Sequence, residues 1–240
     1  MMKLDILVFS AHPDDAEVGC GGTILKQVAL GDKVGMIDLT RGELGTRGSA
    51  EIRAQEALDA KRVLGLQVRE NLWMRDCFFV IDEAHTRQII QAVRKYQPRI
   101  VLANAPHDRH PDHGRACKLV TEAAFIAGLP QIKTELDGEL QEAWRPELVL
   151  QYIQNTYIKL DILVDITHYW DLKLAAIQAY RSQFYHPEYN EPAVTYISAP
   201  DFFLIHEGRA REFGKYINAP FAEGFTCQRF LGVDNLQHLR

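Results

Sequence analysis

The pattern of hydrophobic and polar residues in the first half of the chain predicts strands and helices that alternate. Short, near-continuous apolar runs have the length and character of buried strands, and the segments between them repeat apolar residues with helical spacing. The runs predicted as strands are 4–11, 34–39, 71–74 and 99–103. The segments predicted as helices are 23–30, 50–64, 81–96 and 113–127.

This alternation predicts an α/β fold that is Rossmann-like, with a mostly parallel sheet flanked by helices and right-handed crossovers. The usual strand order of such a doubly wound sheet is 3-2-1-4-5. The second half is less regular, with strands predicted at 148–152 and 161–166, a helix from Thr167 to about Tyr180, and an irregular segment over 184–200. Since the sequence contains no linker and no repeat, we expect a single domain over residues 1–240.

Composition and charge narrow the range of partners. Hydrophobic residues make up 47% and charged residues 25% of the chain, as in ordinary globular proteins. The formal net charge is −5, without the basic stripe that nucleic-acid binders carry. The longest stretch without a charged residue, 148–158, has 11 residues, whereas a membrane-spanning helix needs about 20 apolar ones. We therefore expect neither a nucleic-acid nor a membrane partner.

The cysteines indicate the cellular compartment in which we expect the protein. Cys20, Cys77, Cys117 and Cys227 are scattered and form no C-x-x-C pair. The first apolar run is too short and too early for the core of a secretion signal. Free thiols and a cytoplasmic location are therefore expected.

Two polar clusters follow strands that we expect to be neighbours. Ala11-His12-Pro13-Asp14-Asp15 comes after the first strand, and His107-Asp108-Arg109-His110-Pro111-Asp112-His113 comes after the fourth. In the expected strand order these two strands lie side by side at the switch point, where ligands bind beyond the strand ends. The two clusters should therefore meet in one crevice. Taken alone, each has a structural explanation, because Asp is a common residue at helix starts.

Imidazoles and carboxylates together suit Zn²⁺, with Fe²⁺ or another first-row divalent ion as alternatives. A catalytic zinc site takes three protein ligands; His12 and Asp15 would supply two, and either His110 or His113 the third. Such an ion activates water and polarises a carbonyl. Asp14 is then the candidate general base, and the remaining histidine, oriented by Asp112, would stabilise an oxyanion or protonate a leaving amine.

The glycines Gly19, Gly21 and Gly22 give a competing interpretation. A glycine cluster after a first strand is typical of dinucleotide sites, but Ile24 stands where the third glycine of that fingerprint belongs. We expect a close-packed helix start that faces the crevice, with N–H groups available to an anion. A nucleotide-binding module remains an alternative, as does a metal phosphoesterase or esterase, although two-metal phosphatases need more carboxylates than are found nearby.

Taken together, these residues resemble the LmbE-like (PIG-L) N-acetylglucosaminyl deacetylase family. The run from Ala11 to Glu17 matches the first family motif without a gap, and His110-Pro111-Asp112-His113 matches the second. The loop Thr40-Arg41-Gly42-Glu43 and the pair Arg53 and Glu56 also fit. Chain length, the loop 41–48 and the segments 170–173 and 181–183 are similar to the branch that serves bacillithiol biosynthesis.

The resemblance implies a role for each matching residue. His12, Asp15 and His113 would hold the metal, Asp14 would be the general base, His110 with Asp112 the oxyanion stabiliser and acid, and Arg53 would hold the sugar. The implied substrate is an N-acetylglucosamine conjugate, N-acetylglucosaminyl-malate in this branch, cleaved to acetate and the amino sugar. Another N-acetyl sugar or a thiol-conjugate amide is the alternative. The branch is often hexameric, so a homo-oligomer is expected.

One further residue is our own candidate. Arg109 lies inside the second cluster but outside the matched motif. Because arginine makes bidentate pairs with carboxylates, we expect Arg109 to bind the malate group of such a substrate.

Overall fold

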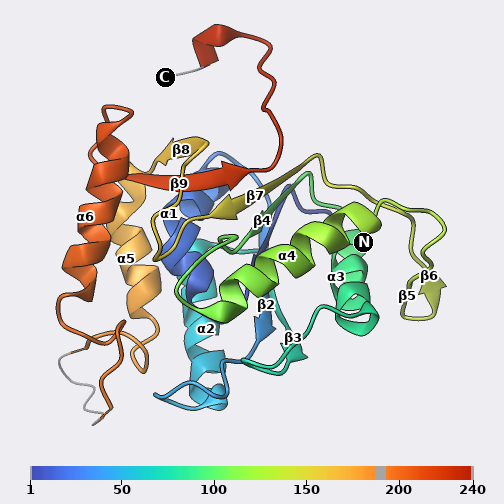
Figure 1. The fold of residues 1–240 in the computed structure, drawn as a ribbon, viewed down its shortest axis with the longest axis horizontal. Helices are drawn as coiled ribbons and strands as arrows, with labels where there is room; N and C mark the ends of the chain where they lie inside the picture. Colours follow the sequence, from blue (N-terminus) through green and yellow to red (C-terminus); the bar gives the residue numbers. More distant parts are fainter. Residues whose placement is uncertain (1, 187–192, 239–240) are drawn as a thin grey trace.

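The computed structural model describes residues 2–186 and 193–238, and Figure 1 shows the path of the chain. The main strands are β1 (Ile6–Ser10), β2 (Val34–Thr40), β3 (Val68–Met74), β4 (Ile100–Ala103), β7 (Leu148–Tyr152), β8 (Ile162–Asp165) and β9 (Ala222–Cys227). The α-helices are α1 (Asp15–Ala29), α2 (Ala50–Leu64), α3 (Glu83–Tyr96), α4 (Pro111–Ile126), α5 (Trp170–Gln178) and α6 (Phe202–Lys215). The short elements are β5 (Glu135–Leu136), β6 (Glu139–Leu140) and the 3-10 turns η1 (Thr167–Tyr169) and η2 (Leu236–His238).

The seven main strands form one sheet in the order β3-β2-β1-β4-β7-β9-β8. The pairs from β3 to β7 are all parallel, whereas β9 runs antiparallel to both β7 and β8. The predicted order of the first five strands is therefore confirmed, with β7 as the fifth. The predicted fold class, an α/β fold with a mostly parallel sheet flanked by helices, is confirmed as well.

Helices cover both faces of this sheet (Figure 1). One core cluster packs α3 and α4 against the strands, with Ile89, Val93 and Leu119 fully buried. On the other face, α1 and α5 pack together through residues such as Ile24 and Ala176. All five residues of β1 are buried, because the strand lies between these two layers. The carboxyl ends of β1 and β4 are thus held rigidly side by side.

Helix α1 starts at Asp15, eight residues before the predicted start, so the glycine cluster lies within its bounds, at a kink where Cys20 has non-helical dihedral angles (φ −145°, ψ 19°). The expected close packing is present, since a Cβ on Gly19 would lie 2.2 Å from the Tyr152 ring and one on Gly22 would lie 2.7 Å from Ile166. The N–H of Gly22 donates to Glu223 at 2.9 Å, so it is not available to an anion. The prediction of an anion-binding helix start was therefore wrong.

Other differences lie mostly in the second half. The helix α6, the strand β9 and the β5–β6 hairpin were not predicted. In β9 the buried Glu223 interrupts the apolar pattern. Its burial is possible because its carboxylate accepts a hydrogen bond from Lys173 Nζ at 2.5 Å. The described residues of the segment 184–200 contain no helix or strand, as predicted, and residues 187–192 lie outside the description.

Two smaller expectations were also tested. All four cysteines are free. Within the described part of the chain, no helix combines the length and the apolar character that crossing a bilayer requires.

Candidate active site

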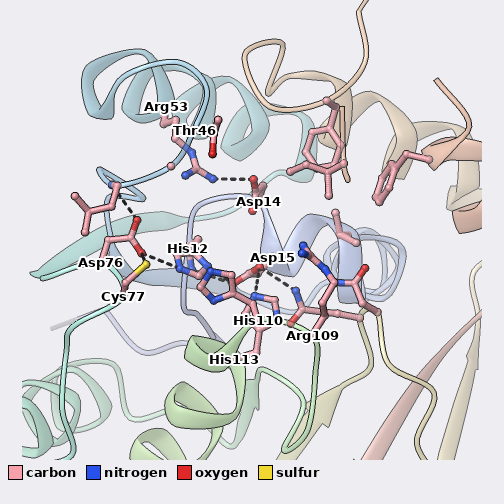
Figure 2. Close-up of a pocket in the computed structure, with 18 residues that line it drawn as sticks. His12, Asp14, Asp15, Thr46, Arg53, Asp76, Cys77, Arg109, His110 and His113 are labelled. Atoms are coloured by element: carbon pink, nitrogen blue, oxygen red, sulfur yellow. Dashed lines mark hydrogen bonds and ion pairs between the residues drawn. The ribbon is translucent and has the colours of Figure 1, made fainter. Parts of the chain in front are cut away.

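The two polar clusters meet at the carboxyl ends of β1 and β4. The ring centroids of His12 and His110 are 4.7 Å apart, and those of His12 and His113 are 5.7 Å apart. Figure 2 shows these rings and Asp15 grouped together, with Arg53 reaching Asp14 nearby. They line a cavity of about 230 Å³. The predicted convergence of sequence-distant clusters is therefore present in the structure.

Asp15, the last residue of the first cluster, reaches a histidine of each cluster. Its carboxylate lies 3.0 Å from His113 Nε2 and 3.4 Å from His12 Nδ1. The amide groups of Asn104 and Gln154 donate to the same carboxylate at 3.0 and 2.9 Å. Burial alone would raise the pKa of Asp15, but the adjacent His113 and His12 hold it well below its ordinary value. Asp15 is therefore a fixed anion between two imidazoles.

The other nitrogen of His113 faces Asp108, which was not among the predicted site residues. His113 Nδ1 and Asp108 Oδ2 are 2.6 Å apart, and the backbone N–H groups of Asn155 and Thr156 donate to Asp108. Burial by itself would lower the pKa of His113, but Asp15 and Asp108 together raise it to about 9. A carboxylate behind a histidine in this way fixes the ring and directs its other nitrogen, as around metal ligands.

His12 is held in the same manner by a second unpredicted residue, Asp76. His12 Nε2 lies 3.0 Å from Asp76 and 3.3 Å from Asp112. Asp76 is also fixed by the N–H of Leu44, which donates to its carboxylate at 3.1 Å. No pattern around Asp76 distinguishes it in the sequence, because it follows a strand as a single acid in a loop.

Asp112 has a different partner from the one expected. Its carboxylate contacts His12, the N–H of Cys77 and the guanidinium of Arg115, at 3.3, 2.9 and 2.5 Å. Towards His110 it offers only its backbone N–H, which donates to Nδ1 at 3.3 Å. The structure therefore brings the Asp112 carboxylate to the first motif and does not place it on the His110 ring.

Asp14 adopts a backbone conformation that is rare outside glycine, with φ of 114°. Such strain costs on the order of 1–3 kcal/mol and is concentrated at functional sites. Arg53 donates to the Asp14 carboxylate at 2.8 Å and to the backbone oxygens of Pro13 and Gly42. Burial raises the pKa of Asp14 to about 7, although the positive charge of Arg53 opposes the rise. Asp14 is thus a buried carboxylate that titrates close to neutrality, as a general base requires.

His110 and Arg109 are less buried than the other charged residues that line the cavity. Burial, followed by the charges of His12 and His113, lowers the pKa of His110. The guanidinium of Arg109 lies 4.9 Å from the centre of the Tyr196 ring and lines the same cavity. His110 and Arg109 therefore add an imidazole and a cation to the lining that are less buried than Asp15.

The donor atoms suit a divalent cation. His12, His110 and His113 bring ligand atoms within 4.8 Å of one another, and so do His12, Asp76 and Asp112. Asp15 contacts two members of the first group. Buried imidazoles among buried carboxylates are the ligand types that zinc and iron prefer. The residues present therefore fit the metal that the motifs imply.

The chain is similar to several known proteins. Residues 7–125 match the PIG-L family model, described as GlcNAc-PI de-N-acetylase. The chain is 30% identical over 190 residues to the diacetylchitobiose deacetylase of Thermococcus kodakarensis, covering 75% of this chain and 70% of that protein. It is 28% identical over 194 residues to "Probable N-acetyl-alpha-D-glucosaminyl L-malate deacetylase 2" of Bacillus anthracis, covering 75% and 81%. Among solved structures, the conserved protein TT1542 of Thermus thermophilus superposes with a TM-score of 0.85 at 36% identity, covering 96% and 98%.

Proposed function

The chain belongs to the PIG-L family, and from this membership and the site geometry we propose that it is a metal-dependent hydrolase that removes the acetyl group from an N-acetyl sugar conjugate. The observation that carries the proposal is the buried contact of Asp15 with both His12 and His113, beside Asp14. The bacillithiol branch is a narrower proposal, supported by a relative at 28% identity.

We propose His12, Asp15 and His113 as the metal ligands, with Zn²⁺ as the first candidate ion. Asp76 and Asp108 support this choice, because each lies behind one of the two histidines, at 3.0 and 2.6 Å. When bound, the ion would lower the pKa of a water molecule and polarise the amide carbonyl.

Proton transfers fall to the chain's own side chains. Asp14 accepts the proton of the attacking water, since its carboxylate lines the cavity beside the proposed ligands. His110, in its protonated form, would stabilise the negative oxygen of the tetrahedral intermediate and pass its proton to the leaving nitrogen, and the proton taken up by Asp14 would then restore that of His110. Arg53 orients Asp14 through the 2.8 Å contact and borders the space for the sugar. Asp112 has a positioning role. Its carboxylate contacts His12, and the residue itself lies in the first turn of α4.

The substrate we propose is an N-acetylglucosamine conjugate with an acidic group, N-acetylglucosaminyl-malate being the first candidate. We expect the N-acetyl group and its sugar ring to occupy the cavity of about 230 Å³. Arg109 lines that cavity and is placed to pair with a carboxylate. A second N-acetyl sugar or a thiol-conjugate amide would use the same reacting groups. We further propose that residues 1–240 act as one domain; the homo-oligomer stays a prediction.

Acetate release tests the proposal. The zinc-loaded protein is incubated with N-acetylglucosaminyl-malate, N-acetylglucosamine, an acetyl ester and a phosphomonoester, each with and without a chelator. We expect chelator-sensitive acetate release from the N-acetyl sugars and the fastest release from the malate conjugate. Turnover of the phosphomonoester alone, or acetate release that survives complete metal removal, would contradict the proposal.

A further inference from the structure

Two segments that are far apart in the sequence are joined at the edge of the cavity. The loop 41–49 after β2 contributes Leu44, Gly45 and Thr46 to the lining. The segment after α5 contributes Phe184 and Ile197, and α6 adds Phe202 at its first residue. The second segment and α6 therefore supply three apolar side chains of the lining.

Arg47 connects the two segments. Its guanidinium donates to the backbone oxygens of Ser182 and Ala193 at 2.8 and 2.6 Å, and its own carbonyl accepts from Gln183 Nε2 at 2.8 Å. Arg47 is only 6% exposed. Next to it, Gly48 has φ of 67°, and a Cβ there would lie 2.7 Å from Ser182 Oγ. A buried arginine that donates to two backbone carbonyl groups fixes the second segment at Ser182 and Ala193.

Glu56 of α2 also contacts Ser182 in the second segment. Its carboxylate accepts from the N–H and the hydroxyl of Ser182, both at 2.7 Å. Glu56 lies three residues after Arg53, so one turn of α2 contacts both Asp14 and the second segment. Ser182 is fully buried, and loss of Glu56 would leave two buried donors without this acceptor.

Phe184 follows two residues after this anchor. It packs with Phe202, with ring centroids 5.3 Å apart, and against Val18 of α1 and Ala57 of α2. Aromatic and branched side chains of this kind bind the C–H face of a sugar ring. Fixing them before binding saves the free energy that ordering a loop would otherwise cost on association.

Resting on the proposed sugar deacetylase function, we propose that Arg47 and Glu56 are positioning residues for substrate binding. They hold Ser182 and Ala193 so that Phe184 and Ile197 form a preformed wall for the sugar ring. Neither residue contacts the proposed metal ligands through any described hydrogen bond or ion pair. Their loss should therefore raise KM much more than it lowers kcat.

The test compares Glu56→Ala and Glu56→Gln in the zinc-loaded protein. With both hydrogen bonds lost, Glu56→Ala should raise KM for the N-acetyl sugar by about tenfold and leave kcat within about threefold. Glu56→Gln should restore most of the wild-type KM, because an amide can accept from the Ser182 N–H and donate to its hydroxyl. Arg47→Ala should shift KM in the same direction. Glu51→Ala and Arg62→Ala, exposed on the same helix, are the matched controls.

Hydrogen exchange of peptides that contain Ser182 gives a readout independent of activity. Exchange should be faster in Glu56→Ala than in wild type or Glu51→Ala, with or without metal, because the buried N–H has lost its acceptor. Unchanged protection in Glu56→Ala, or a fall in kcat with KM unchanged, would overturn the proposal. A wild-type protein that releases no acetate from any N-acetyl sugar would instead refute the proposed function, and the sugar-binding role of the wall with it.

Discussion

The first 126 residues and the remainder of the chain contribute different kinds of side chain to the same cavity. Every imidazole and carboxylate in its lining comes from the first part, whereas the described residues of the second part that line it are all uncharged. The loops of the regular βα units follow the carboxyl ends of the parallel strands, and their polar groups converge there. The later, mixed part adds the apolar side chains of Phe184, Ile197 and Phe202, and its Gln154 donates to Asp15. The comparison predicts that the reacting groups and the apolar lining can be changed separately by mutation.

The largest effect should come from the base in the first part. We expect Asp14→Asn to lower kcat by about 10²–10⁴-fold, because the variant cannot accept a proton from water. Asparagine tolerates a positive φ, so the strained backbone should persist. Steady-state kinetics and zinc content are measured together, with Asp59→Asn on the surface of α2 as the control. Wild-type turnover in Asp14→Asn would exclude this residue as the base.

A smaller effect is expected at Asp76, which contacts the proposed ligand His12. Asp76→Asn removes the negative charge beside His12 Nε2, 3.0 Å away, and should weaken zinc affinity by about 10–100-fold. Competition with a chromogenic chelator measures this, with Asp137→Asn in the β5–β6 turn as control. If zinc affinity were unchanged while His12→Ala abolished it, Asp76 would have no part in holding the metal.

Next in size is a change at the boundary between the two parts, where Arg109 lies against Tyr196. Arg109→Gln should raise KM for the malate conjugate by about tenfold, because a charge-assisted pair is worth about 1.5–3 kcal/mol. KM for a neutral N-acetyl sugar should stay the same. Equal effects on both substrates would show that Arg109 shapes the cavity and does not read the acidic group.

The smallest effect concerns how the two parts are joined. The Tyr180 hydroxyl donates to Glu17 at 2.9 Å, a buried link from the segment after α5 to α1. Tyr180→Phe should lower the free energy of unfolding by about 1 kcal/mol, while kcat stays close to wild type. Urea denaturation measures it against Tyr157→Phe, an exposed position. A tenfold fall in kcat would mean that this link also serves the reaction.

The two parts also differ in how far sequence predicts them. Apolar runs such as β1 and helix starts such as Ser49 are local signals, so the parallel core and the convergence of the two histidine motifs could be predicted. Asp76 and Asp108 could not, because a single loop acid acquires its role only from the histidine that folding brings beside it.

In the second part, buried charge hides the elements. Glu223 can occupy an interior position of β9 because Lys173 pairs with its charge and the N–H groups of Gly22 and Thr23 donate to its carboxylate. Hydrophobic periodicity has no means of indicating such a pairing across 50 residues or more. The early start of α1 has another cause, since its glycines serve close packing against Tyr152 and Ile166 and the helix continues beyond them with a kink at Cys20.

Anomalous diffraction at the zinc edge, from crystals grown with Zn²⁺, tests the central claim most directly. Two overlapping groups of donor atoms share His12, so the position of the ion distinguishes them. We predict one peak per chain, about 2.0–2.2 Å from a nitrogen of His12, a nitrogen of His113 and an oxygen of Asp15. A peak bound by His12, Asp76 and Asp112 instead, or no peak at this end of the sheet, would contradict the account.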